Sequence, residues 1–274
     1  MPLGRTAILH QLPYAAPPRA KGALRIEAGA GGLSLLRQEG ALRALFPRKP
    51  HVEAVILNTS GGATGGDRLE IEARATPGGH LRLTTQAAER AYRSSGGPAA
   101  RIRNRLAAET GARLDWLPQE TILYRGCDLD RALTLDLAPG AQALLVEPVI
   151  FGRALMGEVL DEAQFRDRIE IRRDGAPLYL DAMRIEGNVA AHLSRPAVAN
   201  GAGAMASVIL AAAEAEAHLA PIRALLPATA GATLIAPDLL VLRLLAEDGF
   251  VLRQTLLPVL ELLTGGTLPA SWRL

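Results

Sequence analysis

The chain has 274 residues, of which 49% are hydrophobic, and its formal net charge at pH 7 is +2. A chain of this size can bury a large core and can form one domain or two. Basic residues are interleaved with acidic ones, and aromatic residues make up only 4% of the chain, so the composition gives no sign of nucleic-acid binding.

The sequence carries no signal for secretion or for a membrane. The apolar run Ala7–Leu9 is too short for a secretory signal, and no stretch is long and apolar enough to span a bilayer. The single cysteine, Cys127, excludes an internal disulfide and a CxxC-type zinc site, and it suits a reducing compartment. We therefore expect a soluble, cytoplasmic protein.

From residue 22 to about residue 185, apolar and polar residues alternate with a period of two, as in half-buried strands. Short turn signals such as ATPGGH, RSSGGP and APGA separate these runs. The strongest hairpin signal is Asp174-Gly175, which stands between two alternating runs. The segment TTQAAERAYRS is ambiguous between helix and strand, and we predict it to be extended. Together these patterns predict a mainly β, antiparallel body over about residues 22–200.

Within this body, residues 58–71 read NTSGGATGGDRLEI and could be a phosphate-binding loop or a sharp turn. A P-loop needs a lysine after its last glycine, where this chain has Asp67. A dinucleotide fingerprint needs the spacing GxGxxG before a helix, whereas these glycines form adjacent pairs followed by a period-two run. The segment therefore predicts a turn that uses glycine for positive φ.

The pattern changes after residue 200. The alanine-rich segment MASVILAAAEAEAHLAPIRALL has Ile209, Ala213, Glu216 and Ala220 at helical spacing, which predicts a helix. A strand is then expected in LLVLRLLAEDG, and a second helix in GFVLRQTLLPVLELLTGG, ending at Gly265. Because no linker or repeat interrupts the chain, we predict a single domain over residues 1–274, with its helices and a strand at about 201–265.

Enzymatic motifs are missing from this sequence. No serine has the GxSxG setting of a hydrolase. Cys127 precedes Asp128, whose charge would raise the thiol pKa and disfavour a nucleophilic role. The five histidines form no HxH, HExxH or HxxxH motif.

Several carboxylates, in contrast, occupy unusual places. Glu147 stands among apolar residues in ALLVEPVIFGR, Asp181 follows PLYL, and Glu158 follows GRALMG. A buried charge must be paired or hydrated. Two interpretations remain open: salt bridges to an arginine such as Arg153 or Arg184, or acids that line a wet internal passage.

Four motifs give the sequence a family resemblance. The segments GGATGGDRLEI, LTTQAAERAYRS, LDWLPQETILYRG and FGRALMGE resemble, in order and spacing, those of the urease accessory protein family UreD, also called UreH. The resemblance extends over most of the chain and is strongest from about 57 to 185. Near the C-terminus LPASWRL keeps the family's Pro269 and Trp272 but lacks the usual arginine after the proline.

The resemblance implies an elongated, β-rich maturation factor that is not an enzyme. Members bind the urease apoprotein and the accessory protein UreF, and through UreF the GTPase UreG, in the complex that delivers nickel to urease. An internal water-filled tunnel has been proposed for the family, and its acidic positions match Asp67, Glu147 and Asp181 here. We expect transient nickel and no permanently bound cofactor. The alternative is a purely structural adaptor that carries no metal.

Overall fold

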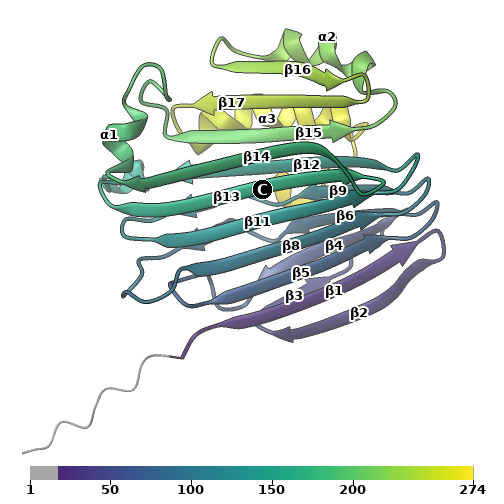
Figure 1. Ribbon diagram of the computed structural model, residues 1–274, viewed down its shortest axis with the longest axis horizontal. Coiled ribbons are helices and arrows are strands. Elements are labelled where there is room, and N and C mark those ends of the chain that lie inside the picture. Colours follow the sequence, from purple (N-terminus) through teal and green to yellow (C-terminus); the bar gives the residue numbers. More distant parts are fainter. Residues whose placement is uncertain (1–17, 274) are drawn as a thin grey trace, which may run out of the picture.

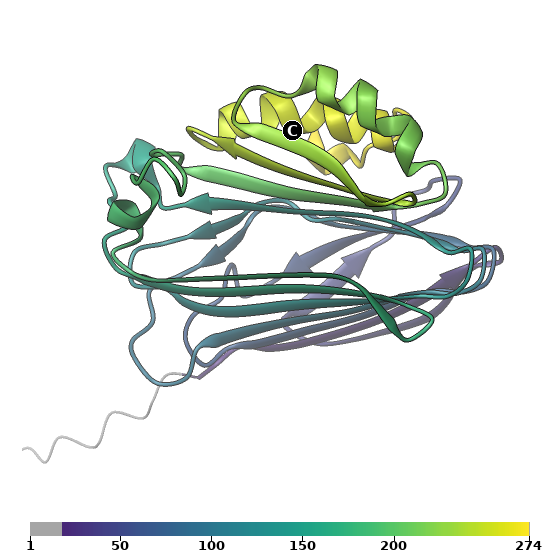
Figure 2. The same cartoon turned by 45° about the horizontal axis from the view of Figure 1, so that its top comes forward.

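The computed structural model describes residues 18–273, so the run Ala7–Leu9 lies outside the described residues. The described chain forms two stacked β-sheets, and helices cover the outer face of one of them (Figure 1) (Figure 2). The prediction of a mainly β domain with its main helices near the C-terminus is therefore confirmed.

The first sheet, called sheet A below, has seven strands within residues 18–273. Their spatial order is β14 (Ala176–Gly187), β13 (Ala163–Arg173), β11 (Asp128–Leu137), β8 (Ala100–Ala108), β5 (Arg68–Ala75), β1 (Lys21–Gly29) and β2 (Gly32–Gly40). Buried and exposed residues alternate along β5 and β8, because one face of the sheet meets the core and the other meets solvent.

The second sheet, sheet B, has ten strands in the described part of the chain. Its main path is β16 (Ala230–Ala236), β17 (Leu239–Ala246), β15 (Ala204–Ala211), β12 (Gln142–Phe151), β9 (Arg113–Leu117), β6 (His80–Thr85), β4 (Val52–Asn58) and β3 (Leu42–Leu45). Two short strands, β10 (Thr121–Leu123) and β7 (Glu89–Ala91), extend it beside β12. The extended conformation predicted for TTQAAERAYRS is confirmed by β6 and β7.

The expectation of an antiparallel body is wrong for the centre of both sheets. Strands β1, β5, β8, β11 and β13 pair in parallel in sheet A, as do β4, β6, β9 and β12 in sheet B. Successive long strands alternate between the sheets, so the connection between parallel neighbours is a strand of the other sheet instead of a helix. A chain that alternates between two sheets and an antiparallel meander both show period-two runs separated by turns. The sequence pattern therefore does not distinguish them.

Antiparallel pairing occurs at the ends of the sheets. There the hairpin predicted at Asp174-Gly175 is confirmed: it joins β13 to β14, and the two turn residues have φ values of 53° and 75°. Positive φ at both central residues matches the twist of the flanking strands.

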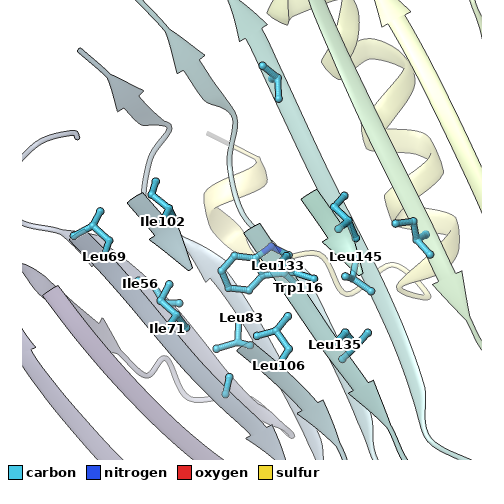
Figure 3. Packing of buried hydrophobic residues seen from close by; sticks show 14 of the residues in the cluster. Ile56, Leu69, Ile71, Leu83, Ile102, Leu106, Trp116, Leu133, Leu135 and Leu145 are labelled. Atoms are coloured by element: carbon cyan, nitrogen blue, oxygen red, sulfur yellow. The ribbon is translucent and has the colours of Figure 1, made fainter. Parts of the chain in front are cut away.

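The larger apolar core lies between the two sheets. Leu69, Ile71, Ile102 and Leu133 of sheet A meet Leu83, Trp116 and Leu145 of sheet B in Figure 3. The sheet A residues occupy the inward positions of alternating strands, so the period-two pattern accounts for their side of the layer. The strands that carry the sheet B residues are buried on both faces and do not alternate.

A second apolar layer covers the outer face of sheet B. It is formed by α2 (Ala215–Leu225), α3 (Gly249–Leu263) and the C-terminal 3₁₀ turn Ala270–Trp272. Trp272 is 1% exposed, and its indole Nε1 donates to the carbonyl of Leu117 at 2.9 Å. The strand and helix predicted at the C-terminus are confirmed as β17 and α3.

The helix predicted across the alanine-rich segment is wrong over its first half. Ala204–Ala211 form strand β15, and the helix α2 starts only at Ala215. Every residue of β15 is buried, since the inter-sheet core covers one face and helix α3 packs near the other. A strand that is apolar on both faces shows no period of two, and its alanines then resemble a helix. The short helix α1 (Val189–Leu193) and strand β16 were not predicted.

No helix described between residues 18 and 273 is long and apolar enough to cross a membrane.

Replacing Trp272 by alanine tests whether the C-terminal turn holds the outer layer. The substitution removes a buried indole and its hydrogen bond, so we expect it to lower the free energy of unfolding by about 3–5 kcal/mol. Phe250 is 69% exposed on α3, so Phe250→Ala, as the control, should change the free energy by no more than about 0.5 kcal/mol. Urea unfolding measures both. Equal effects of the two variants would contradict the packing described here.

Candidate functional site

A cavity of about 300 Å³ lies between the two sheets. Sheet A contributes Leu69, Ile71, Ile102, Asn104 and Arg131 to its wall, and sheet B contributes residues that include Asn58, Glu89, Trp116, Thr121 and Glu147. The wall is therefore apolar over much of its area but carries several polar groups that point inward from strands. This mixture is typical of ligand sites in proteins.

Arg131 is the central charge beside this cavity. It occupies an inward position of β11 between Leu129 and Leu133, and its side chain is 5% exposed. Its Nε and Nη2 donate to the two oxygens of Asp167 at 2.9 and 2.6 Å, and its Nη1 donates to Thr121 Oγ1 at 2.9 Å. Burial opposes its charge, but Asp167 and Glu147 outweigh burial and hold the pKa of Arg131 above its usual range.

Glu147 meets Arg131 from the opposite sheet. The Nη1 atom of Arg131 lies 2.6 Å from Glu147 Oε2, while Trp116 Nε1 donates to Oε1 at 2.8 Å. The Arg131 contact is ionic, because within the described chain Oε2 accepts no hydrogen bond. Burial raises the pKa of Glu147, and the nearby negative charge of Asp167 raises it further. The positive charge of Arg131 lowers this pKa but does not outweigh burial.

Asn104 supplies a second buried oxygen without a hydrogen bond. It lies on β8, is 3% exposed and lines the cavity, and its Oδ1 has no donor among the described residues. Buried polar atoms are nearly always satisfied in native proteins, so an exception needs an explanation. Of the buried oxygens without a hydrogen bond in the described chain, Asn104 Oδ1 and Glu147 Oε2 belong to residues that line this cavity.

Glu89 and Asn58 lie in another part of the cavity wall. The Asn58 Nδ2 donates to both oxygens of Glu89, at 3.2 and 3.1 Å, and also to the carbonyl of Gly62 at 3.2 Å. Ser60 donates to Asn58 Oδ1 and thereby fixes the orientation of the amide. Burial raises the pKa of Glu89 even though the Asn58 hydrogen bond lowers it.

The glycine-rich segment is a sharp turn, as predicted, and it positions this part of the wall. Gly61, Gly62 and Gly66 have φ values of 78°, 153° and 89°, which favour glycine. A Cβ atom on Gly62 would lie 2.6 Å from the carbonyl oxygen of Arg90 and 2.3 Å from the Tyr92 ring, so the close approach to β7 also requires glycine. Both Gly61 and Gly62 line the cavity.

Asp67 closes the base of this turn. It is 4% exposed, and its two carboxylate oxygens accept the backbone N–H groups of Ala20 and Thr64 at 2.7 and 2.8 Å. The described wall of the cavity does not include Asp67. The structure thus places this predicted residue behind the cavity wall, where it holds the loop in shape.

Asp181 lies on β14 and accepts a hydrogen bond from Arg243 Nη2. In sheet B, Glu147 pairs in register with Ser207, and Ser207 pairs with Arg243. A row of polar residues therefore leads from Glu147 through Ser207 to the pair of Arg243 and Asp181. The structure relates Glu147 to Asp181 by this row, and it leaves Asp67 outside it.

Glu147, Asp181 and Glu158 each form a salt bridge with an arginine, as one of the two interpretations expected. For two of them the arginine is not one that the sequence suggested. Glu158 pairs with Arg153 at 2.6 Å, as considered. Glu147 pairs with Arg131 and Asp181 with Arg243, arginines that are distant in sequence. Sequence reasoning missed Glu89, Asn104, Arg131 and Asp167. A usable signal existed for Asn104 and Arg131, since each interrupts the apolar positions of an alternating strand.

Comparison with known proteins decides the family. A family model described as UreD urease accessory protein matches residues 19–273. The chain belongs to the UreD family. It is 52% identical to the urease accessory protein UreD of Roseobacter denitrificans over 262 residues, 94% of this chain and 96% of the relative. It is 54% identical to UreD of Ruegeria pomeroyi over 88% of this chain and 94% of that protein, and 43% identical to UreD of Paracoccus denitrificans over 93% and 92%.

Cys127 and His80 of this UreD-family chain are held by burial and by local contacts. Cys127 is buried, and burial together with the charge of Asp128 raises its pKa to about 12. His80 hydrogen-bonds Asp115 at 2.8 Å and stacks on His51. No group of three or more His, Cys, Asp or Glu side chains within residues 18–273 is arranged to hold a metal ion.

The Arg131 cluster can be tested by removing its cation. Arg131→Met leaves Glu147 and Asp167 buried without a counter-charge, so we expect the free energy of unfolding to fall by about 3–5 kcal/mol. The double variant Arg131→Met with Glu147→Gln should recover part of this loss. Urea unfolding is the measurement. Arg184 forms an exposed pair with Glu186 on sheet A, and Arg184→Met should cost no more than about 1 kcal/mol. An Arg131→Met midpoint equal to the parent's would refute the assignment.

Glu89 predicts a distinct pH dependence of stability. Because its folded pKa is raised, the folded state binds its proton more tightly than the unfolded state does, and stability falls as pH rises from the ordinary glutamate pKa of 4.5 through the folded pKa. Glu89→Gln should therefore melt at a higher temperature than the parent at pH 7, and the difference should vanish at pH 4 and below.

Glu170 gives the control with the opposite sign. Hydrogen bonds from Arg168 and Arg172 lower its pKa, so its carboxylate stabilises the folded state above the ordinary glutamate pKa of 4.5, and this contribution is lost in acid. Glu170→Gln should melt below the parent at pH 7 and approach it at low pH. Differential scanning calorimetry from below pH 4 up to pH 8 separates the two cases. A Glu89→Gln difference that is independent of pH would contradict the prediction.

Proposed function

We propose that this UreD-family protein assembles with the urease apoprotein and UreF, and through UreF with UreG, and that its inter-sheet cavity passes nickel toward urease. The observation that carries the proposal is that two buried oxygens without a hydrogen bond, Asn104 Oδ1 and Glu147 Oε2, belong to residues that line one cavity between the sheets. Glu147 Oε2 has only its ionic contact with Arg131, at 2.6 Å. In this proposal nickel is cargo, and the protein keeps no permanent cofactor. The protein acts in the cytoplasm and without catalysis.

The charge balance around the cavity supports a passing cation. Arg131 faces two carboxylates, Glu147 and Asp167, and Glu89 has no cation within 4.0 Å among the described residues. Arg90 also lines the cavity, so these three carboxylates stand against two guanidinium groups. A divalent ion entering the cavity would relieve this imbalance and would lower the pKa values of Glu89 and Glu147, which burial raises.

The donor type supports passage instead of storage. Carboxylate and amide oxygens hold nickel more loosely than imidazole or thiolate groups, which bind late first-row metals tightly. A conduit must admit the ion and also release it. In the proposed path Glu147 and Asp181 serve as successive oxygen sites, and Asp67 acts by fixing the turn that carries Asn58 and Gly62.

A structural adaptor that carries no metal is the second candidate. The observation that favours it is that Glu147 and Asp181 both have arginine partners, Arg131 and Arg243, which by themselves account for the buried charge. In this alternative the cavity is a packing feature, and the protein serves only to recruit the other components.

Two neutral variants separate these candidates. Glu147→Gln and Glu89→Gln keep the side-chain shape but remove charge from the cavity, and Glu72→Gln on the outer face of β5 is the control. Each variant is co-expressed with urease and the other accessory proteins. Affinity purification reports the complex, and elemental analysis reports nickel per urease.

If the cavity passes nickel, all three variants should still form the complex with urease and the other accessory proteins. The same proposal predicts urease nickel and activity reduced by about tenfold for the two cavity variants, the scale on which groups around a metal site act, and unchanged values for Glu72→Gln. Full nickel loading by the cavity variants would favour the adaptor. Loss of the complex with Glu72→Gln as well would show that the assay reports assembly alone.

A further inference from the structure

The outer face of sheet A carries charges that mostly alternate in sign from strand to strand. Arg25 on β1 pairs in register with Glu72 on β5, and Glu72 pairs with Arg105 on β8. The next outward row places Glu27 beside Arg74. Opposite charges on neighbouring strands attract, whereas like charges directly opposite each other are destabilising.

One row departs from this arrangement. Lys21, Arg68 and Arg101 are register partners on β1, β5 and β8, strands that lie side by side in Figure 1. All three side chains are exposed on the outer face. Neighbouring strands are about 4.8 Å apart, so three cations line up across the sheet at that spacing.

The carboxylates around this row are engaged elsewhere. Asp130, the next residue of the row, accepts from Arg103 Nη2 at 2.9 Å, Glu70 lies 3.5 Å from Arg105, and Glu39 pairs with Arg37. Within residues 18–273, no carboxylate oxygen lies within 4.0 Å of a side-chain nitrogen of Lys21, Arg68 or Arg101. Residues 1–17 contain no aspartate or glutamate that could supply one.

Arg19 adds a fourth cation at the same end of the sheet. It is half-buried against Gly66, just before β5, and it donates to Ser95 Oγ at 3.1 Å. Like the three row residues, it has no carboxylate within 4.0 Å in the described chain. Four cations without a carboxylate partner in the described chain therefore lie at the end of sheet A where the parallel strands β1, β5 and β8 begin.

We infer that Lys21, Arg68 and Arg101 form a docking row for an acidic helical segment of a partner protein. Acidic residues at positions i and i+4 of a helix lie about 5–6 Å apart, which matches the spacing of cations on neighbouring strands. The complementary charge supplies what the chain itself lacks. The row lies on the outer face of sheet A, away from the cavity, so the inference does not depend on the proposed passage of nickel.

The surroundings favour a protein partner over a nucleic acid. Strands β1, β5 and β8 contain no aromatic residue on which a base could stack. A surface hollow of about 340 Å³ beside Lys21 and Arg68 is also lined by Glu39 and Glu70. These two carboxylates would repel a continuous run of phosphates but suit a peptide in which acidic residues are separated by neutral or basic ones.

Peptide binding tests the docking row. The probe is a fluorescent helical peptide with glutamates at i and i+4, and fluorescence anisotropy measures its affinity for the purified full chain at low and moderate salt. Arg68→Glu with Arg101→Glu should weaken binding by about tenfold or more, because two attractions become repulsions. The matched control is Arg48→Glu with Lys49→Glu, which changes the net charge equally at two exposed residues outside the row, and it should bind like the parent.

Two results would overturn the inference. One is equal weakening by both double variants, or no binding of the peptide at all. The other is a labelled oligothymidylate that binds the row more tightly than the peptide at the same salt concentration. Thermal melting provides an independent check that the variants fold: Arg68→Glu alone should raise the melting temperature, because it places an anion between two cations. A lowered melting temperature would show that the row is already compensated.

Discussion

A buried charge that joins two sheets is the constraint on which the interior of this protein depends. Arg131 reaches from sheet A to Glu147 of sheet B and to Asp167 on its own sheet. An unpaired charge in this layer would be costly, so the two sheets must keep the register that brings the three groups together. The inter-sheet layer that contains Arg131 and Glu147 also contains the cavity, which both residues line.

The glycine-rich turn applies the same principle to the backbone. Its positive φ values allow the chain to reverse next to β7, and Asp67 accepts the backbone N–H of Thr64 within the turn and that of Ala20 just before β1. The carbonyl of Gly62 in this turn accepts a hydrogen bond from Asn58, and Asn58 also donates to Glu89 beside the cavity. A carboxylate outside the wall therefore controls the geometry of one inside it.

Local patterns predicted much of the fold, and tertiary contacts determined the rest. Alternation predicted the mainly β body, and Asp174-Gly175 located a hairpin, because each signal depends on neighbouring residues. Parallel pairing depends on which sheet the next strand enters, and β15 is buried on both faces, so neither leaves a local trace. Glu147 stood out as a charge among apolar residues. Its partner Arg131, sixteen positions earlier on another sheet, could not be paired with it from spacing alone.

The geometry of Arg131 also determines which carboxylate can respond to a cation. Asp167 holds the guanidinium through two hydrogen bonds, a bidentate arrangement that is strong and directional. Glu147 touches it only through an ionic contact, and its Oε2 has no hydrogen bond within the described chain. Asp167 therefore fixes the guanidinium in place, whereas Glu147 adds charge compensation from the opposite sheet. In the proposed passage of nickel, Glu147 is the carboxylate that would exchange its contact with Arg131 for the ion, because the two hydrogen bonds to Asp167 can hold Arg131 without it.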